Sequence, residues 1–548
     1  MHLKEIQQEN QALSLEDRTG DVQATTQLPA SDVQGQTSAK LDSLQKDIKL
    51  CLGEILALRQ DLLLSDGSRA RERQILDWLD FRQVSWRYEG IDRAYQKTYE
   101  WIFERSTSHP AWDNFLAHRH NDVEDPYLIN GKAGSGKSTL LKFIYEHSKT
   151  EEALKQWAGT NELMILRFFS WNLGTALQKT HLGMLRGLLH AALEQYPELI
   201  PAVLPKLYRN LDSTGTEPEP EYVEIKQAFD LFIKKSRYLR LVIIIDGIDE
   251  FEGDYRDMFL FLRSLASHRV KLIISSRPLN ACLESLSGCP TLRLQDLTRK
   301  DMRAFVDGEL STQHLMLRLV RHFPAIAPQL ASDIVDKAEG VFLWVKLVVR
   351  LLVDGLANGY DLNELQARLT ALPSGLRELY ERMFRGMEVE YQKQAAVLFQ
   401  LNERWLSLAY DKPLSGLVLW YAINSSLTLF DQSIVPMPDE VYDWNLSSLV
   451  RRVQSRCCGL LELRHTGKAL DGSSAITTLG EFISFDEVGY VTVAYMHRTV
   501  HEFLTMDEVW QEVSSLTRDM EFSISTRLVS ACLSTMKLAK HSRDCELD

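Results

Sequence analysis

The eight residues from Gly131 to Ser138 constrain the fold of this chain more than any other stretch. Their sequence, GKAGSGKS, matches the pattern G-x-x-x-x-G-K-[ST], between a short apolar run that predicts a strand and a run that predicts a helix. Glycines let such a loop wrap phosphate oxygens with backbone N–H groups, and the following helix adds its positive N-terminal end. The predicted nucleotide-binding residues here are Gly131, Lys132, Ala133, Gly134, Ser135, Gly136, Lys137, Ser138 and Thr139.

Two residues of this loop and one distant aspartate predict a magnesium–nucleotide site. Lys137 would supply a positive charge to the β and γ phosphates, and the hydroxyl of Ser138 is an oxygen ligand suited to Mg²⁺. The apolar run before Asp246 predicts a buried strand that ends in a carboxylate, at the end of a sheet where ligands bind. We therefore predict a nucleoside triphosphate with Mg²⁺ held by Ser138 and Asp246.

Three further side chains are candidates for catalysis. Asp249 or Glu250 could polarise an attacking water; the alternative is a solvated cluster of loop carboxylates. Arg277 follows another apolar run and should emerge at the same sheet edge as Asp246, where a guanidinium could detect the γ-phosphate. The alternative for Arg277 is a surface arginine that ends a strand.

Strand-like runs alternate with helical patterns between residues 126 and 297, which predicts an α/β P-loop core whose parallel sheet has helices on both faces. One of these runs, Leu163 to Phe169, lies in sequence between the P-loop strand and the strand ending at Asp246. This favours the additional-strand group of P-loop ATPases over the kinase-GTPase group. The predicted strands are Tyr127 to Asn130, Leu163 to Phe169, Leu241 to Asp246, Val270 to Ser275 and Thr291 to Leu294.

The flanking segments differ in pattern from this core. Residues 1–38 are polar, which predicts a disordered arm, and residues 39–66 carry apolar side chains at spacings of three and four. The latter pattern predicts either a short coiled coil or one amphipathic helix packed on its own chain. The remaining predicted domains are an aromatic-rich helical lead-in at 75–125, the NTPase core at 126–297, a helical domain at 298–375, a winged-helix-like domain at 376–510 and a C-terminal helical tail at 511–548.

Within the winged-helix-like segment, Phe482 to Phe485 and Tyr490 to Tyr495 flank a short Gly-containing loop, which predicts a hairpin. A helix is expected to begin near His497.

Composition narrows the function classes. The 548 residues suffice for two to four domains, and the net charge of -13 disfavours a nucleic-acid partner. The seven cysteines lack metal-ligand spacing, and no secretory signal is recognisable at Met1, so we expect a reducing, cytoplasmic location. The most apolar stretch, Val341 to Leu356, is short and carries two cations, so we expect a buried helix and no membrane span.

Taken together, these motifs resemble the NACHT domains of STAND NTPases, in particular the fungal NLR-like group with a nephrocystin-3-like NACHT module. The resemblance covers roughly residues 75 to 510. It is carried by Thr98 to Phe103 (TYEWIF), Gly131 to Ser138, Phe168 to Asn172 (FFSWN), Asp246 to Glu250 (DGIDE), Ser275 to Pro278 (SSRP), Gly340 to Val345 (GVFLWV) and His497 to Leu504 (HRTVHEFL).

The resemblance implies an NTPase core followed by a helical domain and a winged helix. It further implies that ADP holds a closed state, that exchange for ATP permits homo-oligomerisation, and that His497 reaches the β-phosphate of ADP. Two positions depart from the family pattern: Tyr95 stands where a histidine is frequent, and Phe342 replaces a proline that packs on the adenine. The base contact must therefore differ or come from elsewhere. No ankyrin, WD40 or leucine-rich repeats are recognisable after residue 510.

The leading hypothesis is a signalling switch that binds ATP or ADP with Mg²⁺, with GTP left open as the nucleotide, and that turns over slowly as an NTPase. The alternative is a non-catalytic scaffold that retains its nucleotide and recruits an unidentified protein partner through residues 41–64. A motor acting on nucleic acid is disfavoured by the acidic composition.

Overall fold

The computed structural model describes residues 68–81, 83–104, 113, 115, 124–210, 218–312, 314, 316–317, 326–408, 413–424, 438–465, 491–520 and 523–538. The predicted arm at 1–38, the predicted helix at 39–66 and residues 482–490 of the predicted hairpin lie outside these ranges. Residues 1–71 and 72–548 form two compact units, and every candidate site residue belongs to the second.

A five-stranded parallel sheet forms the centre of the NTPase core, in the order β2-β3-β4-β1-β5. Its strands are β1 (Tyr127–Asn130), β2 (Glu162–Phe169), β3 (Leu239–Asp246), β4 (Val270–Ser276) and β5 (Thr291–Arg293). All five predicted strands are confirmed. Because β4 separates the P-loop strand β1 from β3, the sheet has the order expected of the additional-strand group.

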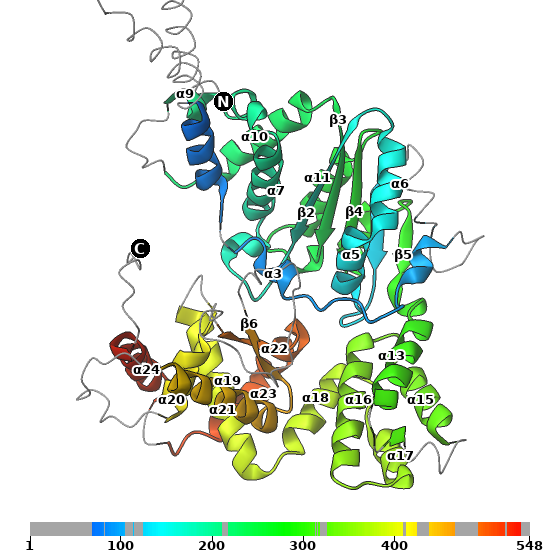
Figure 1. Cartoon of the computed structure of the whole chain (residues 1–548), viewed down its shortest axis with the longest axis vertical. Helices are drawn as coiled ribbons and strands as arrows, with labels where there is room; N and C mark the ends of the chain where they lie inside the picture. The colour runs from blue at the N-terminus through cyan, green and yellow to red at the C-terminus, as the bar shows by residue number, and fades with distance from the viewer. Residues whose placement is uncertain are drawn as a thin grey trace, which may run out of the picture. The chain divides into compact units, whose positions relative to one another are not determined.

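The sheet is covered on both faces, which explains why β3 reads as an unbroken apolar run. Successive side chains of a strand point to opposite faces. Ile243 and Ile245 accordingly pack in the same core as α7, α10 and α11, whereas Val242 and Ile244 pack with α5 and α6 (Figure 1). The core helices are α5 (Lys137–Glu146), α6 (Ser148–Ala158), α7 (His181–Gln195), α8 (Ile200–Val203), α9 (Pro205–Asn210), α10 (Tyr222–Lys235), α11 (Tyr255–Leu265) and α12 (Asn280–Ser285).

The lead-in begins with the end of a helix at residues 68–79 and is less helical after it. Between residues 83 and 104 it contains only α3 (Trp86–Glu89) and the 3₁₀ helix η1 (Glu100–Phe103). Side chains of other elements hold its backbone instead: Lys142 of α5 donates to the carbonyls of Tyr88 and Ile91, at 3.1 and 2.8 Å. The lead-in is thus a strap fastened to the helix that follows the P-loop.

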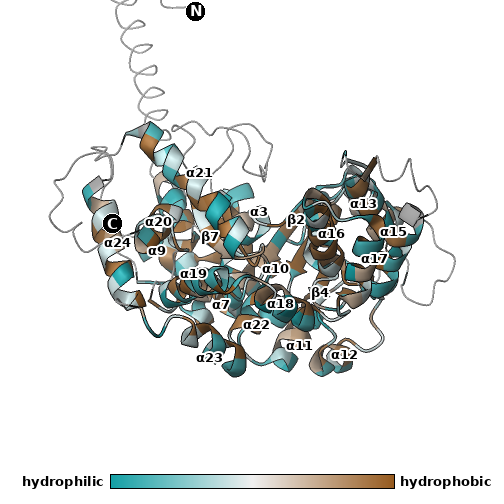
Figure 2. Cartoon of the chain, turned by 90° about the horizontal axis from the view of Figure 1, so that it is seen from below, coloured by the Kyte–Doolittle hydropathy of each residue, from teal (hydrophilic) through white to brown (hydrophobic). Residues whose placement is uncertain are grey.

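The C-terminal half is helical and shares one continuous hydrophobic core. The predicted buried helix is confirmed as α16, which appears largely brown in Figure 2, whereas α18 shows more teal. Among the described residues, no helix is long and apolar enough to cross a bilayer. The helices are α13 (Arg299–Thr312), α15 (Ile326–Lys337), α16 (Phe342–Ala357), α17 (Leu362–Ala371), α18 (Leu376–Arg385), α19 (Val389–Leu408), α20 (Gly416–Asn424), α21 (Asp439–Arg456), α22 (Arg498–Leu504), α23 (Asp507–Ser515) and α24 (Ile524–Leu538).

A two-stranded antiparallel sheet leads into α22. Strand β7 (Val491–Tyr495) confirms the second strand of the predicted hairpin, and its partner among the described residues is β6 (Leu461–His465). His497 is the N-cap residue of α22, so the predicted helix start is confirmed. The domain limits remain predictions, and the limit set at residue 510 falls inside α23.

Candidate functional site

The P-loop has the open backbone that a phosphate site requires. Gly134 and Gly136 have φ angles of 72° and 97°, a region that side chains rarely adopt. A Cβ atom on Gly136 would lie 2.4 Å from the hydroxyl of Tyr99, so only glycine fits there. Gly136 is the N-cap of α5 and makes no side-chain cap hydrogen bond, which leaves the first N–H groups of this ten-residue helix open to an anion.

The two predicted metal ligands meet across the sheet edge. Asp246, only 1% exposed, is hydrogen-bonded to Ser138 and accepts a 2.5 Å hydrogen bond from the hydroxyl of Ser275. Burial raises the pKa of Asp246 above its usual value, an effect that nearby Arg87 and the two serine hydrogen bonds oppose. The Ser138 hydroxyl and the Asp246 carboxylate therefore form a paired oxygen set of the kind that Mg²⁺ accepts beside a nucleotide phosphate.

One cavity of about 570 Å³ joins the predicted residues. Its lining includes most of the P-loop, the end of β3, the loop after β4, and His497 from the far end of the chain. The predicted residues in this lining are Ala133, Gly134, Gly136, Lys137, Ser138, Thr139, Asp246, Asp249, Glu250, Arg277 and His497.

Three predicted nucleotide-binding residues lie outside that lining: Gly131, Lys132 and Ser135. Lys132 is half-exposed and turns toward Glu339, whose carbonyl oxygen it contacts at 3.2 Å. The ammonium of Lys137 instead donates to the carbonyl oxygens of Gly131 and Lys132, at 2.8 and 3.1 Å. Burial lowers the pKa of Lys137, against the pull of Asp249 and Asp246, so an incoming phosphate would favour its charged form.

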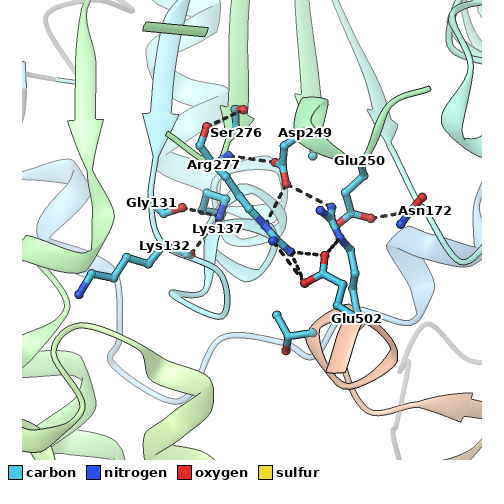
Figure 3. A network of polar contacts seen from close by, with 12 residues as sticks. Gly131, Lys132, Lys137, Asn172, Asp249, Glu250, Ser276, Arg277 and Glu502 are labelled. Atoms are coloured by element: carbon cyan, nitrogen blue, oxygen red, sulfur yellow. Dashed lines mark hydrogen bonds and ion pairs between the residues drawn. The ribbon is translucent and has the colours of Figure 1, made fainter. Parts of the chain in front are cut away.

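The candidate catalytic residues are held by α22 in a network that we call the clasp (Figure 3), formed by Asp249, Glu250 and Arg277 of the core with Arg498 and Glu502 of α22. Arg498 contacts Asp249 at 3.1 Å and Glu250 at 3.3 Å. Arg277 contacts Asp249 at 3.1 Å and Glu502 at 3.1 Å. The sequence motif around His497 contains Arg498 and Glu502, but nothing in it indicates these distant partners.

His497 faces the cavity as a neutral donor. Its Nδ1 accepts a 3.2 Å hydrogen bond from the backbone N–H of Thr499, which leaves the proton of a neutral imidazole on Nε2. Burial lowers the pKa of His497 well below its usual value, and four cations reinforce this, Arg87 the strongest of them. An Nε2–H donor in a cavity rich in cations suits a phosphate oxygen.

Aromatic rings gather in another part of the same cavity. Tyr95 packs on Phe305 at 5.1 Å between ring centroids, and Phe305 packs on Phe342 at 5.3 Å. The two positions that depart from the family pattern, Tyr95 and Phe342, are therefore neighbours through a third ring. Phe305 could not be found from a motif, because it lies within an ordinary amphipathic helix, α13.

Comparisons with known proteins agree with this arrangement. Residues 97–277 match the family described as nephrocystin 3, N-terminal, and residues 386–547 match a domain of unknown function, DUF7791. Nephrocystin-3 of Xenopus laevis is 23% identical over 491 residues, which are 82% of this chain and 32% of the relative. The chain thus spans about a third of the length of that relative.

Solved structures match this chain at low identity and with low TM-scores. A STAND protein with a tetratricopeptide repeat sensor from Pyrococcus horikoshii is 14% identical, with 81% of this chain and 50% of that chain covered and a TM-score of 0.32. The ORC1 protein of Aeropyrum pernix, solved in complex with DNA, is 11% identical, with 73% and 91% covered and a TM-score of 0.29. At these scores the chains do not superpose closely.

The parallel sheet, its strand order and the glycine loop at the end of β1 define a P-loop NTPase fold. Within that class, residues 97–277 are similar to the nephrocystin-3 N-terminal domain.

Replacing Asp246 with asparagine should remove the contribution of Mg²⁺ to ATP binding, because an amide lacks the charge that favours the metal. In the unchanged protein this contribution should fade as the pH is lowered, and at a higher pH than for an ordinary aspartate, because burial raises the pKa of Asp246 and only the carboxylate binds Mg²⁺. Calorimetric titration with and without Mg²⁺ between pH 5 and 8 measures both.

The matched control is Glu252→Gln, an exposed carboxylate on the same loop that pairs with Lys179 at 2.6 Å and does not line the cavity. An Asp246→Asn variant that kept the full Mg²⁺ effect would rule out Asp246 as a ligand.

Proposed function

We propose that this protein is a NACHT-type signalling switch that binds ATP or ADP with Mg²⁺ and couples exchange or slow hydrolysis to domain rearrangement and oligomerisation. The observation that carries this proposal is the composition of the cavity: the P-loop and His497, the N-cap residue of α22, line it together although they are more than 350 residues apart in the sequence. A nucleotide that contacts both the P-loop and His497 can hold the core and the C-terminal half together. A nucleotide that binds the closed arrangement better than the open one shifts the equilibrium toward the closed arrangement.

In this proposal the phosphates are held by Lys137, the N-terminus of α5 and His497, with Mg²⁺ on Ser138 and Asp246. The nucleotide supplies a polyphosphate whose charge the chain must balance. The base would lie against Tyr95, Phe305 and Phe342, whose flat rings can stack on adenine or guanine. The choice between ATP and GTP is then decided by titration with both.

The clasp supports a closed resting state. Asp249 and Glu250, either of which could orient the attacking water, are occupied by Arg498, and Arg277 is occupied by Glu502. Asp249 is only 8% exposed, so these charges stabilise one another away from water. A γ-phosphate near Arg277 would compete with Glu502 for its guanidinium, which favours release of α22 with ATP and retention with ADP.

The clasp also supports the second candidate, a scaffold that retains its nucleotide. Carboxylates paired with Arg498 cannot orient an attacking water, so the nucleotide would be hydrolysed slowly or not at all. That candidate assigns partner recruitment to residues 41–64, outside the described ranges. Both candidates fit a cytoplasmic protein, and the described cysteines Cys282, Cys289, Cys457, Cys458 and Cys532 are free thiols.

Replacing His497 with alanine should loosen ADP and raise the oligomer content. The variant loses one neutral donor to a phosphate, a loss of about 10-fold in ADP affinity for a net hydrogen bond near 1.4 kcal/mol. Light scattering of the protein with ADP and with a non-hydrolysable ATP analogue measures the mass, and a fluorescent ADP displacement assay measures retention.

The control is His501→Ala, one turn along α22, since His501 contacts Glu403 at 3.3 Å and does not line the nucleotide cavity. Identical masses with both nucleotides would count against a switch and would leave the scaffold.

A further inference from the structure

Arg87, in the lead-in helix α3, is a cation that has no hydrogen-bond or ion-pair partner among the described residues. Its side chain lines the nucleotide cavity, and its Nε is buried. Among the described residues its guanidinium makes no hydrogen bond and no ion pair. Neither the motifs of the P-loop core nor the family departures noted above assign it a role.

The residues beside Arg87 fix its position relative to the P-loop. The hydroxyl of Tyr88 donates to Glu146 of α5 at 2.7 Å, and the ring of Tyr88 packs edge-on against Phe169 at the end of β2, at 5.2 Å. Lys142, also on α5, donates to the carbonyl oxygen of Tyr88. Because these contacts anchor Tyr88 to the helix that begins at the P-loop, Arg87 is held at a set place on the cavity wall.

Of the other guanidinium groups that line the cavity, Arg93 is exposed to water, and Arg277 and Arg464 have counter-ions or acceptors. Arg277 belongs to the clasp, and Lys346 contacts Asp92 at 2.6 Å. Arg464 contacts Glu462 at 3.5 Å and donates to the carbonyl of Met496 at 3.1 Å. A half-buried guanidinium that has five N–H donors and no acceptor is costly unless a ligand supplies the negative charge.

The surroundings of Arg87 locate that ligand at the metal side of the phosphates. Arg87 lines the nucleotide cavity together with Asp246, the predicted Mg²⁺ ligand, and His497. It also lines, together with Glu250 and His497, an adjoining cavity of about 240 Å³ whose lining does not include the aromatic rings of the proposed base site. In a P-loop site this end of the nucleotide carries the γ-phosphate, where attacking water and metal meet.

We propose that Arg87 binds the γ-phosphate of the nucleoside triphosphate, as a cation supplied in cis by the segment that precedes the P-loop. The proposal rests on the proposed nucleotide binding and adds a residue that discriminates triphosphate from diphosphate. A planar guanidinium can donate two parallel hydrogen bonds to phosphate oxygens, which an ammonium cannot. Because α3 is part of the lead-in strap, the strap would be coupled to the presence of the γ-phosphate.

The test compares two variants. Arg87→Gln keeps two N–H donors but no charge, and Arg87→Lys keeps the charge but loses the planar pair of parallel donors. Calorimetric titration of the full chain with Mg²⁺ and either ADP or a non-hydrolysable ATP analogue gives both affinities. We expect Arg87→Gln to lower the affinity for the ATP analogue by about 10- to 100-fold, the loss expected for one charge-assisted hydrogen bond. The affinity for ADP should change by less than about 3-fold, and Arg87→Lys should recover part of the loss.

The control is Arg73→Gln, an exposed arginine just before the lead-in that does not line the cavity. Thermal unfolding without nucleotide identifies any general loss of structure. If Arg87→Gln lost affinity equally for ADP and the ATP analogue, or lost affinity for neither, the assignment of Arg87 would be overturned while the proposed nucleotide binding would stand. A wild-type protein that bound neither nucleotide would instead overturn the proposed function itself.

Discussion

Replacing Lys137 with alanine should abolish binding of both ADP and the ATP analogue. Lys137 is a charged donor in a half-buried loop, and its ammonium donates hydrogen bonds to two carbonyl oxygens of that loop. A bound phosphate would replace these carbonyls as the acceptor. Removing a charged hydrogen-bonding partner costs about 3–5 kcal/mol when the other charge is left unpaired, which corresponds to a loss of at least about 100-fold in affinity. Calorimetry or fluorescent-nucleotide anisotropy measures this directly.

Lys132→Ala is the matched control. It removes a lysine from the same loop, but one whose side chain is half-exposed and turned to Glu339. Its nucleotide affinity should stay within about 2-fold of the unchanged protein, because exposed ion pairs contribute little. Equal affinities for Lys137→Ala and the unchanged protein would show that the cavity is not the nucleotide site.

Opening the clasp should speed release of ADP and raise hydrolysis. In Arg498→Ala the carboxylates of Asp249 and Glu250 lose their shared cation, and Glu502 loses a 2.7 Å contact within α22. Removing one partner of a buried charge network costs about 3–5 kcal/mol. We expect most of this free energy to be lost from the closed state, so ADP release should accelerate by about 100-fold. Stopped-flow displacement of fluorescent ADP measures the rate, and phosphate release measures turnover.

An exposed ion pair of the same C-terminal half provides the comparison. Arg385 contacts Glu512 at 3.0 Å but lies far from the cavity in sequence and outside its lining, so Arg385→Ala should leave ADP release unchanged. If Arg498→Ala released ADP at the unchanged rate, the clasp would be a structural contact and the closed state would need another explanation.

Local patterns in the sequence were enough to predict the strands of the sheet and the two parts of the site that belong to the NTPase core, the P-loop and the strand ending at Asp246. The strand ending at Asp246 was predictable because a strand covered on both faces reads as a continuous apolar run. The P-loop was predictable because its glycines and lysine are adjacent. Since parallel strands deliver their carboxyl ends to one edge, these two patterns predicted that Ser138 and Asp246 lie close together, and both line the same cavity.

The rest depends on pairs that no local pattern links. The contact of Arg277 with Glu502 joins residues 225 apart in sequence, and that of Arg498 with Asp249 joins residues 249 apart. Arg87 is inconspicuous in sequence because what distinguishes it is its place on the cavity wall with no partner among the described residues, which is a property of the folded chain. The lead-in was predicted as helical because it is dense in aromatic residues, but two of its carbonyl groups, those of Tyr88 and Ile91, accept hydrogen bonds from Lys142 of another element.

The central claim is that a nucleotide between the P-loop and α22 controls whether the two stay together. Spin labels placed through non-canonical amino acids at the exposed positions Glu284 of α12 and Glu508 of α23 would report their separation by pulsed electron resonance. The account predicts one short distance with Mg²⁺ and ADP, and a longer one with Mg²⁺ and the ATP analogue. The same distance distribution with both nucleotides, in a protein that binds both, would contradict it.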